Sequence, residues 1–504
     1  MKKHLRLLSL LLSAVMLCAL LCACSGGEEN QSTPVGEGGE ETFDITQGFY
    51  GYKIPEGVDY ENRVIGVLTL GNYQIKPEDN PEYSAETASA VISAASECTR
   101  KVEQLLNVQV EEEAIVTGSR YGGPFYKRVV EDAVSDTATY LVIMPALTEA
   151  AMLASDGLLY DMNKIVDLKN PWWCDAFNDA VTIADKTYFA SGDITTVGLE
   201  TTMFVAFNKV IEGKHELAKG YGYSSLYEMV DKGAWTQDVM FEMSKAVYSD
   251  TNENNICDPG DNVGISGQHN IVYWLLRSGD INVCTLDSDG YPTLTVNNER
   301  AISLITKAQE FCQDPVSGLV IADDYKDYSG PLNPCVQAFV DCRGLFLFNA
   351  VGALNTIRTM EDDFGVLPCP KFDASQENYN CNVGAWTSNC VAVPTSINPA
   401  DLELATHFIE SLGAASHTIL TPVHYEQTLQ YQVSRDDDSM RMLDIINNNR
   451  APELSEMYRW GKMMQTIADL RLAPVGTFVS AYDAIDEQTM LEIDETVQNF
   501  KDRD

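Results

Sequence analysis

The strongest constraint on the fold is a regular alternation of strand-like and helix-like segments along the chain. Residues 63–68 are a short run of strand-forming side chains, and residues 91–105 place apolar side chains three and four positions apart, as one face of a helix does. A strand-like run at 108–116, a helix-like run at 124–134 and an apolar strand at 140–144 follow. Strands that alternate with helices predict an α/β fold with mostly parallel sheets covered by helices.

The same alternation returns further along the chain. Strand-like and helix-like runs occur at 203–206, 235–247, 298–312, 345–348, 364–367, 391–393 and 399–412. The last run opens with Asn398 at the capping position and Pro399 at the first helical position, which is typical of a helix start. About 450 residues follow the N-terminal segments, enough for two or more lobes.

The N-terminus predicts export from the cytoplasm. Basic residues precede an apolar run over 7–23, which is shorter than the roughly 20 residues of a membrane-spanning helix. The run ends in Leu21-Cys22-Ala23-Cys24, which resembles the bacterial lipobox and would make Cys24 the lipidated first residue of the mature protein. The alternative is an ordinary signal peptide that happens to contain cysteines. We therefore expect a lipoprotein signal peptide over 1–23 and a lipid anchor at the extracellular face of the cell membrane.

The segment after Cys24 is rich in Gly, Glu, Ser and Thr and poor in large apolar side chains. Such a segment cannot bury enough surface to offset the entropy lost on ordering. We expect residues 24–57 to form a disordered acidic tether.

Acidic residues outnumber basic ones, with 74 Asp and Glu against 34 Lys and Arg, so the formal net charge is −40. An acidic surface repels phosphates. We therefore expect no nucleic-acid partner, and no contact with the membrane other than through the lipid.

The cysteines permit two interpretations. Ten lie between Cys98 and Cys390, and none forms a Cys-x-x-Cys pair. Secretion favours disulfides, whereas the apolar surroundings of Cys98, Cys284, Cys342 and Cys390 favour buried free thiols. The sequence leaves both open.

Several short motifs occur in the order typical of one family of exported proteins. They lie at 188–195 and 203–209, at 233–238 (Gly-Ala-Trp-Thr-Gln-Asp), at 339–346, at 363–370 (Asp-Phe-Gly-Val-Leu-Pro-Cys-Pro), at 392–394 and at 442–446. Together they resemble the extracellular solute-binding protein family 1, the substrate-binding lipoproteins of ABC importers, in its Gram-positive, clostridial form.

This resemblance implies two α/β lobes of the type II periplasmic-binding-protein kind, which close on a ligand like a Venus flytrap. The ligand would be a small solute, a carbohydrate or oligosaccharide, delivered by a monomer to ABC permease subunits. The first lobe would comprise 58–197 plus 364–420, and the second 198–363 plus 421–504.

Ligands of open α/β sheets bind beyond the carboxyl ends of strands, and sugars need aromatic faces together with planar hydrogen-bonding groups. The candidate ligand-binding residues are Asn72, Asp193, Thr195, Trp274, Arg277, Asn349 and Trp386, and Trp172-Trp173 is a further platform. The alternative for each tryptophan is a place in the core or at a rim.

An acidic loop predicts a structural calcium ion. Oxygen ligands fall at alternate positions of a twelve-residue loop, namely Asp250, Asn252, Asn254, the carbonyl of Ile256, Asp258 and Asp261. Asn255 stands where glycine is expected, and Asp261 is shorter than the usual Glu. The alternative is an Asx-rich turn. No other cofactor is expected.

The sequence contains no Gly-x-Ser-x-Gly, Walker, His-Glu-x-x-His or Gly-x-Gly-x-x-Gly motif. We expect a binding protein and not an enzyme. The alternatives are a secreted carbohydrate-active hydrolase or lyase and a ligand-sensing surface protein of the same fold.

Overall fold

The structure is a computed structural model that describes residues 51–84, 88–135, 137–195, 197–326, 329–424 and 437–503. The predicted signal peptide, Cys24 and most of the tether lie outside these residues. At its described end, Tyr52 already contacts the body, since its ring meets Trp172 edge-on at 6.2 Å. None of the helices in the described ranges has the length and apolar character needed to cross a membrane.

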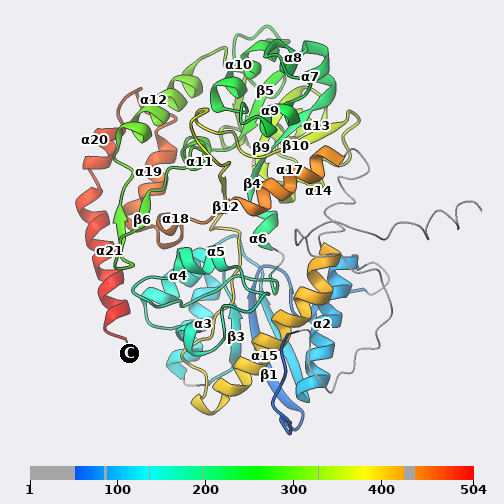
Figure 1. Cartoon of the computed structure of the whole chain (residues 1–504), viewed down its shortest axis with the longest axis vertical. Helices are drawn as coiled ribbons and strands as arrows, with labels where there is room; N and C mark the ends of the chain where they lie inside the picture. The colour runs from blue at the N-terminus through cyan, green and yellow to red at the C-terminus, as the bar shows by residue number, and fades with distance from the viewer. Residues whose placement is uncertain are drawn as a thin grey trace, which may run out of the picture. The chain divides into compact units, whose positions relative to one another are not determined.

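The first sheet has three parallel strands in the order β2-β1-β3, formed by Val108–Ile115, Arg63–Leu70 and Tyr140–Met144. The connection between β1 and β2 is the helix α2 (Ala90–Leu106), which Ser89 caps by accepting a hydrogen bond from the backbone of Ile92. The alternation predicted from the sequence is confirmed here (Figure 1).

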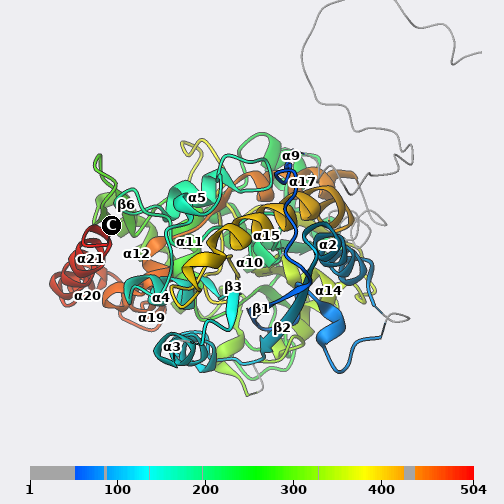
Figure 2. The same ribbon diagram turned by 90° about the horizontal axis from the view of Figure 1, so that it is seen from below.

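Alternate side chains of this sheet enter two different cores. Ile65 and Val67 of β1 pack with α2 and with α15 (Leu402–Ala415), whereas Leu68 and Leu70 pack with α3 (Pro124–Ser135) and α4 (Leu147–Ser155). Helices therefore cover both faces, as a parallel sheet requires, and Figure 2 shows α2 beside α15. This sheet and its helices are called the first lobe below.

The second sheet has five strands in the order β10-β4-β9-β5-β8, formed by Phe364–Leu367, Met203–Asn208, Gly344–Ala350, Val263–Gly267 and Leu319–Ile321. β5 is parallel to both of its neighbours, and β4 is antiparallel to both of its own. The sheet packs against α10 (Gln237–Val247), α11 (Ile271–Ser278) and α13 (Pro334–Val340). Together they form the second lobe, with α12 (Glu299–Gln313) on α11.

One feature departs from the predicted lobe boundaries, and another departs from a predicted strand. β10 was expected in the first lobe but pairs with β4 in the second, so the chain returns to the first lobe only after Leu367. Residues 391–393 form no strand of their own and instead make isolated bridges, of which Ala392 to Ile143 is one.

The C-terminal helices contact both lobes. They are α18 (Leu454–Tyr458), α19 (Met463–Asp469), α20 (Phe478–Asp483) and α21 (Asp486–Lys501). α19 and α20 pack on α11 and α12 of the second lobe, while α18 and α21 reach α4 of the first (Figure 1). Phe500 meets the ring of Tyr188 at 4.5 Å, and Arg503 donates to the carbonyl of Ser155 at 2.6 Å. The predicted second-lobe range 421–504 thus includes a segment shared by both lobes.

The remaining α-helices and strands of the described residues are mostly short. They are α5 (Asp175–Val181), α6 (Val197–Glu200), α7 (Lys209–His215), α8 (Leu217–Gly220), α9 (Leu226–Asp231), β6 (Cys284–Leu286), β7 (Pro292–Leu294), α14 (Leu354–Ile357), β11 (Cys381–Asn382), α17 (Asp437–Asn448) and β12 (Arg450–Ala451). All ten cysteines of the body are free thiols, and for Cys98 burial raises the thiol pKa to about 12.

Candidate functional site

Of three neighbouring cavities, the largest has a volume of about 510 Å³ and is walled by both lobes. The first lobe contributes the segment after β1, including Gly71 and Asn72, together with Arg120 from the loop after β2. The second lobe contributes Glu200 and the residues around Asn355 that follow β9. The cavity therefore lies at the carboxyl ends of β1, β2 and β9, where ligands of such sheets bind.

Two smaller cavities adjoin the first. One of about 230 Å³ is lined by Trp172, Asp193, Thr195 and Arg450, and it shares His424 with the largest cavity. The other, of about 60 Å³, shares Asn389 with the largest cavity and Arg450 with the second. We call the three neighbouring cavities the groove. Of the predicted residues, it brings together Asn72, Asp193, Thr195 and the pair Trp172-Trp173. The two tryptophans are only 1% and 6% exposed, and Trp172 Nε1 donates to Glu410 at 2.7 Å, so their rings pack in the wall and offer little face to a ligand.

Both carboxylates in the described walls of the groove are held by imidazoles. Asp193 Oδ2 lies 2.5 Å from His417 Nδ1, and Glu200 Oε1 lies 3.2 Å from His424 Nε2. The groove thus presents amides, hydroxyls, paired carboxylates and guanidinium groups, which suit a ligand with many hydrogen-bonding groups.

Arg120 was missed by the sequence analysis. Its guanidinium lies at Gly71, where an added Cβ would be 3.6 Å from Nη2, and Gly71 has a φ of +104°, which side chains rarely adopt. Arg120 follows the end of β2, so the rule that pointed to Asn72 after β1 would also have pointed to Arg120.

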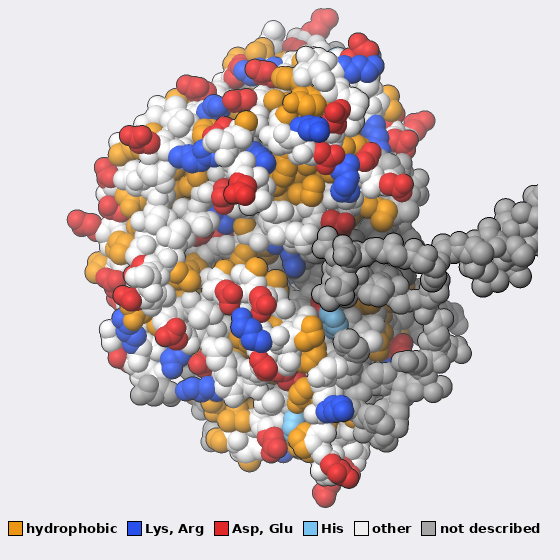
Figure 3. Space-filling view, in the orientation of Figure 1, with side chains coloured by type: hydrophobic (Ala, Val, Ile, Leu, Met, Phe, Trp, Pro, Cys, Tyr) orange, Lys and Arg blue, Asp and Glu red, His pale blue; other side chains and the backbone are white. Residues whose placement is uncertain are grey.

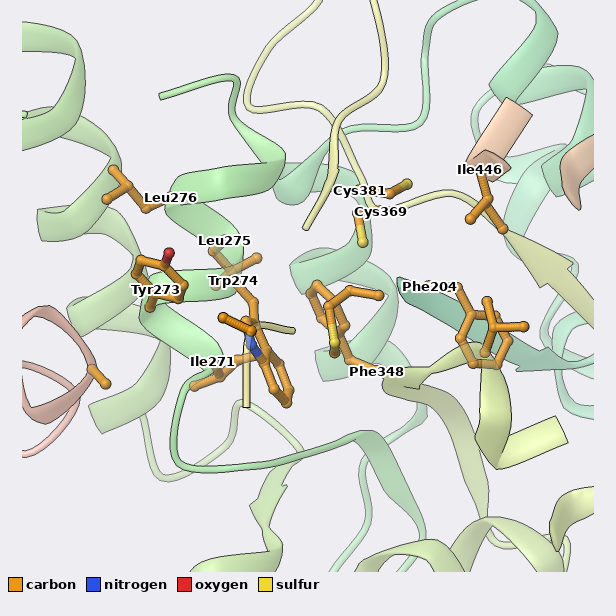
Figure 4. Packing of buried hydrophobic residues seen from close by; sticks show 14 of the residues in the cluster. Phe204, Ile271, Tyr273, Trp274, Leu275, Leu276, Phe348, Cys369, Cys381 and Ile446 are labelled. Carbon is orange, nitrogen blue, oxygen red and sulfur yellow. The ribbon is translucent and has the colours of Figure 1, made fainter. Parts of the chain in front are cut away.

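Trp274 and Arg277 were predicted to bind ligand, and the structure corrects both. All eight residues of α11 are buried. Trp274 is 7% exposed and lies in the core with its ring centroid 5.6 Å from that of Phe348 (Figure 4). Arg277 is 1% exposed and lies 3.2 Å from Glu453, so neither side chain has a face free for a ligand.

Asn349 and Trp386 lie outside the described lining of the groove. Asn349 pairs opposite Phe204 within the sheet, and its side chain accepts a hydrogen bond from the backbone of Ala350. Trp386 is 41% exposed and precedes Thr387, which lines the largest cavity. It therefore remains a candidate for a platform at the edge of the groove.

Trp386 is also part of a stack of side chains. The guanidinium of Arg459 lies 5.6 Å from the centre of the Trp386 ring and 4.9 Å from that of Tyr121. Tyr121 neighbours Arg120, so the stack stands next to two wall residues. An arginine over aromatic faces stabilises both rings.

The predicted calcium loop is closed by its own hydrogen bonds. The side-chain amide of Asn254 donates to Asp258 at 2.6 Å, that of Asn252 donates to the same carboxylate at 3.2 Å, and the backbone of Asn255 donates to Asp250 at 2.8 Å. Asp261 accepts from the backbone of Thr251 at 2.9 Å. In the part of the chain that the structure describes, no three acidic, His or Cys side chains gather as metal ligands would. This arrangement favours the Asx-rich turn.

No family model matches this chain, and no curated protein sequence matches it. Solved structures do. An ABC substrate-binding protein, Lmo0181 from Listeria monocytogenes in complex with cycloalternan, is 11% identical, with a TM-score of 0.54 over 85% of this chain and 99% of that one. A cyclic alpha-maltosyl-1,6-maltose binding protein from Arthrobacter globiformis is 12% identical, with a TM-score of 0.54 over 87% and 100%.

A third structure is the maltose/maltodextrin-binding domain MalE from Bdellovibrio bacteriovorus bound to maltotriose. It is 11% identical, with a TM-score of 0.52 over 86% of this chain and 100% of that one. These likenesses establish the fold: the chain has the two-lobe fold of ABC solute-binding proteins, as the sequence motifs predict.

Proposed function

We propose that this chain is the extracellular solute-binding component of an ABC importer, and that it captures a carbohydrate in the groove and passes it on to a permease. The observation that carries the proposal is a cavity of about 510 Å³ whose walls come from the strand ends of both lobes. The structures with the same fold that were solved with cycloalternan or maltotriose support a sugar as the ligand.

Walls from two lobes give a mechanism for capture. A ligand in the groove contacts residues of both lobes, such as Asn72 and Asn355, only when the lobes are together. Its higher affinity for the closed arrangement then shifts the population of conformations towards it. A permease would recognise the closed conformation.

The place of action is also part of the proposal. The signal-peptide pattern before Cys24 supports an extracellular lipoprotein, with palmitate or a similar acyl chain on that cysteine. We propose that the body is a monomer. No cofactor is needed for capture and release.

We propose binding rather than catalysis. A glycosidase needs two carboxyl groups that are available to the scissile bond. Asp193 and Glu200 line different cavities and are each engaged by an imidazole. The ligand should therefore leave unchanged.

Thermal melting of residues 25–504 against oligosaccharides, peptides and polyols tests the proposal. An oligosaccharide at a hundred times its dissociation constant should stabilise the folded protein by about 2.7 kcal/mol, and mass spectrometry should recover it intact. Asn355→Trp, which fills the largest cavity from an exposed position, should abolish the shift. Thr359→Trp, exposed nearby and outside the cavity lining, is the control. The proposal fails if peptides or polyols alone stabilise the protein, or if Asn355→Trp keeps the full shift.

A further inference from the structure

We infer that the ligand of the groove carries a carboxylate, as an oligosaccharide containing uronic acid does, and that the guanidinium of Arg120 selects it. The inference rests on the proposed function, because it names the class of carbohydrate that the groove takes.

The arginines of the described residues differ in whether a carboxylate pairs with them. Many arginines have a carboxylate at 2.5 to 3.3 Å, in the pairs Arg63–Asp401, Arg128–Glu113, Arg277–Glu453, Arg300–Asp373, Arg343–Asp341, Arg441–Asp231 and Arg471–Asp324. With 74 acidic residues in the chain, carboxylates are plentiful. Within the described ranges, Arg120 and Arg450 are among the arginines that have no such partner, and these two line the groove, whereas Arg100, Arg459 and Arg503 lie outside its lining.

Arg120 has more unused hydrogen-bond donors than Arg450. A guanidinium stays charged and offers five N–H donors, and among the described residues that of Arg120 donates none of them to the protein. Glu149 is the carboxylate that acts on it through space, but the Glu149 oxygens already accept from the backbones of Gly122 and Gly123 at 3.3 and 3.2 Å. Arg450, by contrast, donates to the carbonyl of Asn447 at 3.1 Å.

The guanidinium of Arg120 is partly buried, so its N–H donors have lost part of their contact with water without gaining a protein acceptor. Desolvation by the surrounding protein lowers its pKa, which means that the charged form is disfavoured where it lies. A ligand carboxylate that accepted two parallel hydrogen bonds from the guanidinium would offset this penalty. The groove is thus incomplete on the side of Arg120 without an anion.

The remaining charges of the groove do not compete for Arg120. The two carboxylates in its described walls, Asp193 and Glu200, face His417 and His424. Elsewhere, a chain of net charge −40 repels anions. Figure 3 shows acidic and basic side chains scattered over the face drawn, with no large basic patch on it. The guanidinium groups of the groove are therefore where a small anion would be held.

Asn389 indicates that the anion is part of a sugar. It lines the largest and the smallest cavity, and its side-chain amide donates to the carbonyl of Leu70 at 2.9 Å. Its Oδ1 has no donor among the described residues, and such an oxygen accepts from a hydroxyl. A carboxylate for Arg120 together with a hydroxyl for Asn389 describes an acidic sugar.

Isothermal titration of residues 25–504 with trisaccharides of galacturonate, mannuronate and guluronate tests the inference. Each is compared with its methyl ester, which keeps the length and linkage and removes the charge. At least one acid should bind roughly 10- to 100-fold more tightly than its ester, and its affinity should fall with added salt. Arg120→Gln should remove the preference for the acid. Arg100→Gln, exposed on α2 and outside the groove, should keep it.

The outcomes separate this inference from the proposed function. If esters or neutral sugars such as maltotriose bind as tightly as the acids, the carboxylate assignment is overturned and sugar capture stands. The assignment is also overturned if a trisaccharide of neutral sugars that carries a sulfate group binds more tightly than every uronate. If neither neutral nor acidic sugars bind the folded protein, the proposed function itself fails.

Discussion

Arg277 and Glu453 form an ion pair in which both side chains are 1% exposed and Nη1 lies 3.2 Å from Oε2. Glu453 also accepts hydrogen bonds from the backbones of Val283 and Cys284 at 3.3 and 3.1 Å. The pair ties α11 of the second lobe to the start of the C-terminal helices, which in turn contact the first lobe. Arg277 therefore supports the architecture around the groove and not the ligand.

Replacing Arg277 with Met should lower the free energy of unfolding by about 3–5 kcal/mol, because it leaves Glu453 buried without its partner. Urea denaturation measures the loss. The control is Arg300→Met, which breaks the half-exposed pair with Asp373 and should cost about 1 kcal/mol or less. Equal losses in the two variants would contradict the structural role of Arg277.

The two tryptophans predicted from the sequence should behave differently when replaced with Ala. Trp274→Ala removes a ring packed in the core and should lower stability by about 3–5 kcal/mol. Trp386→Ala removes a ring that is 41% exposed and should change stability far less while weakening ligand binding. Denaturation and titration of both variants check this, and a stable Trp274→Ala protein that fails to bind would restore the original prediction.

The sequence predicted the positions of helices and strands better than the contacts that those helices and strands make with one another. The spacing of apolar side chains predicts β1, α2, β2, α3 and β3 directly, because that spacing differs between a helix and a strand. Asn72 lies at the groove after β1, as the strand-end rule predicts, and Asp193 also lines the groove, although it follows isolated bridges and not a strand. These predictions needed only local information.

The errors concern contacts between distant segments. Trp274 and Arg277 lie on α11, and six of the eight residues in its sequence Ile-Val-Tyr-Trp-Leu-Leu-Arg-Ser are apolar or aromatic, which favours a largely buried helix. The partner of Arg277 is far along the chain, so its identity could not be derived from the helix. Arg120 could be placed after a strand, but its lack of a carboxylate partner is visible only in three dimensions.

Calcium should leave the melting temperature unchanged. The carboxylates of Asp250, Asp258 and Asp261 accept hydrogen bonds from neighbouring amides within the loop, and an ion would have to displace them. Melting curves with about 1 mM calcium and with excess chelator check this, since weak calcium sites in proteins have dissociation constants on the order of 1 mM. A melting temperature that rises with calcium and returns with chelator would restore the metal site.

Glu456 predicts a pH effect of defined sign. Burial raises the pKa of its carboxyl above the usual 4.5, against hydrogen bonds from Asn382, Ala385 and Tyr273. The folded protein therefore holds the proton more tightly than the unfolded chain, so this stabilisation is present below about pH 4.5 and is lost as the pH rises through the raised pKa. The unfolding free energy of the wild type relative to Glu456→Gln should fall over that interval. Urea denaturation from pH 4 upwards measures it, and a difference that grows with pH would contradict the raised pKa.

Glu112 should control the wall of the groove that follows β1. Its buried carboxylate accepts from the backbones of Gln74, Ile75 and Lys76 at 2.5 to 2.9 Å and from the hydroxyl of Thr69 at 2.7 Å. Glu112→Gln replaces one of the two oxygens with an NH₂ group that meets backbone N–H donors, so at least one charge-assisted hydrogen bond is lost, worth about 1.5–3 kcal/mol.

The segment that carries Asn72 should then open more often, and ligand affinity should fall at temperatures far below melting. Hydrogen exchange over residues 71–76 measures the opening directly. Glu111→Gln, exposed on the same strand, is the matched control and should exchange like the wild type. If Glu112→Gln loses stability but keeps both slow exchange in this segment and full affinity, Glu112 stabilises the fold without positioning the wall, since a purely global effect would leave the folded groove intact.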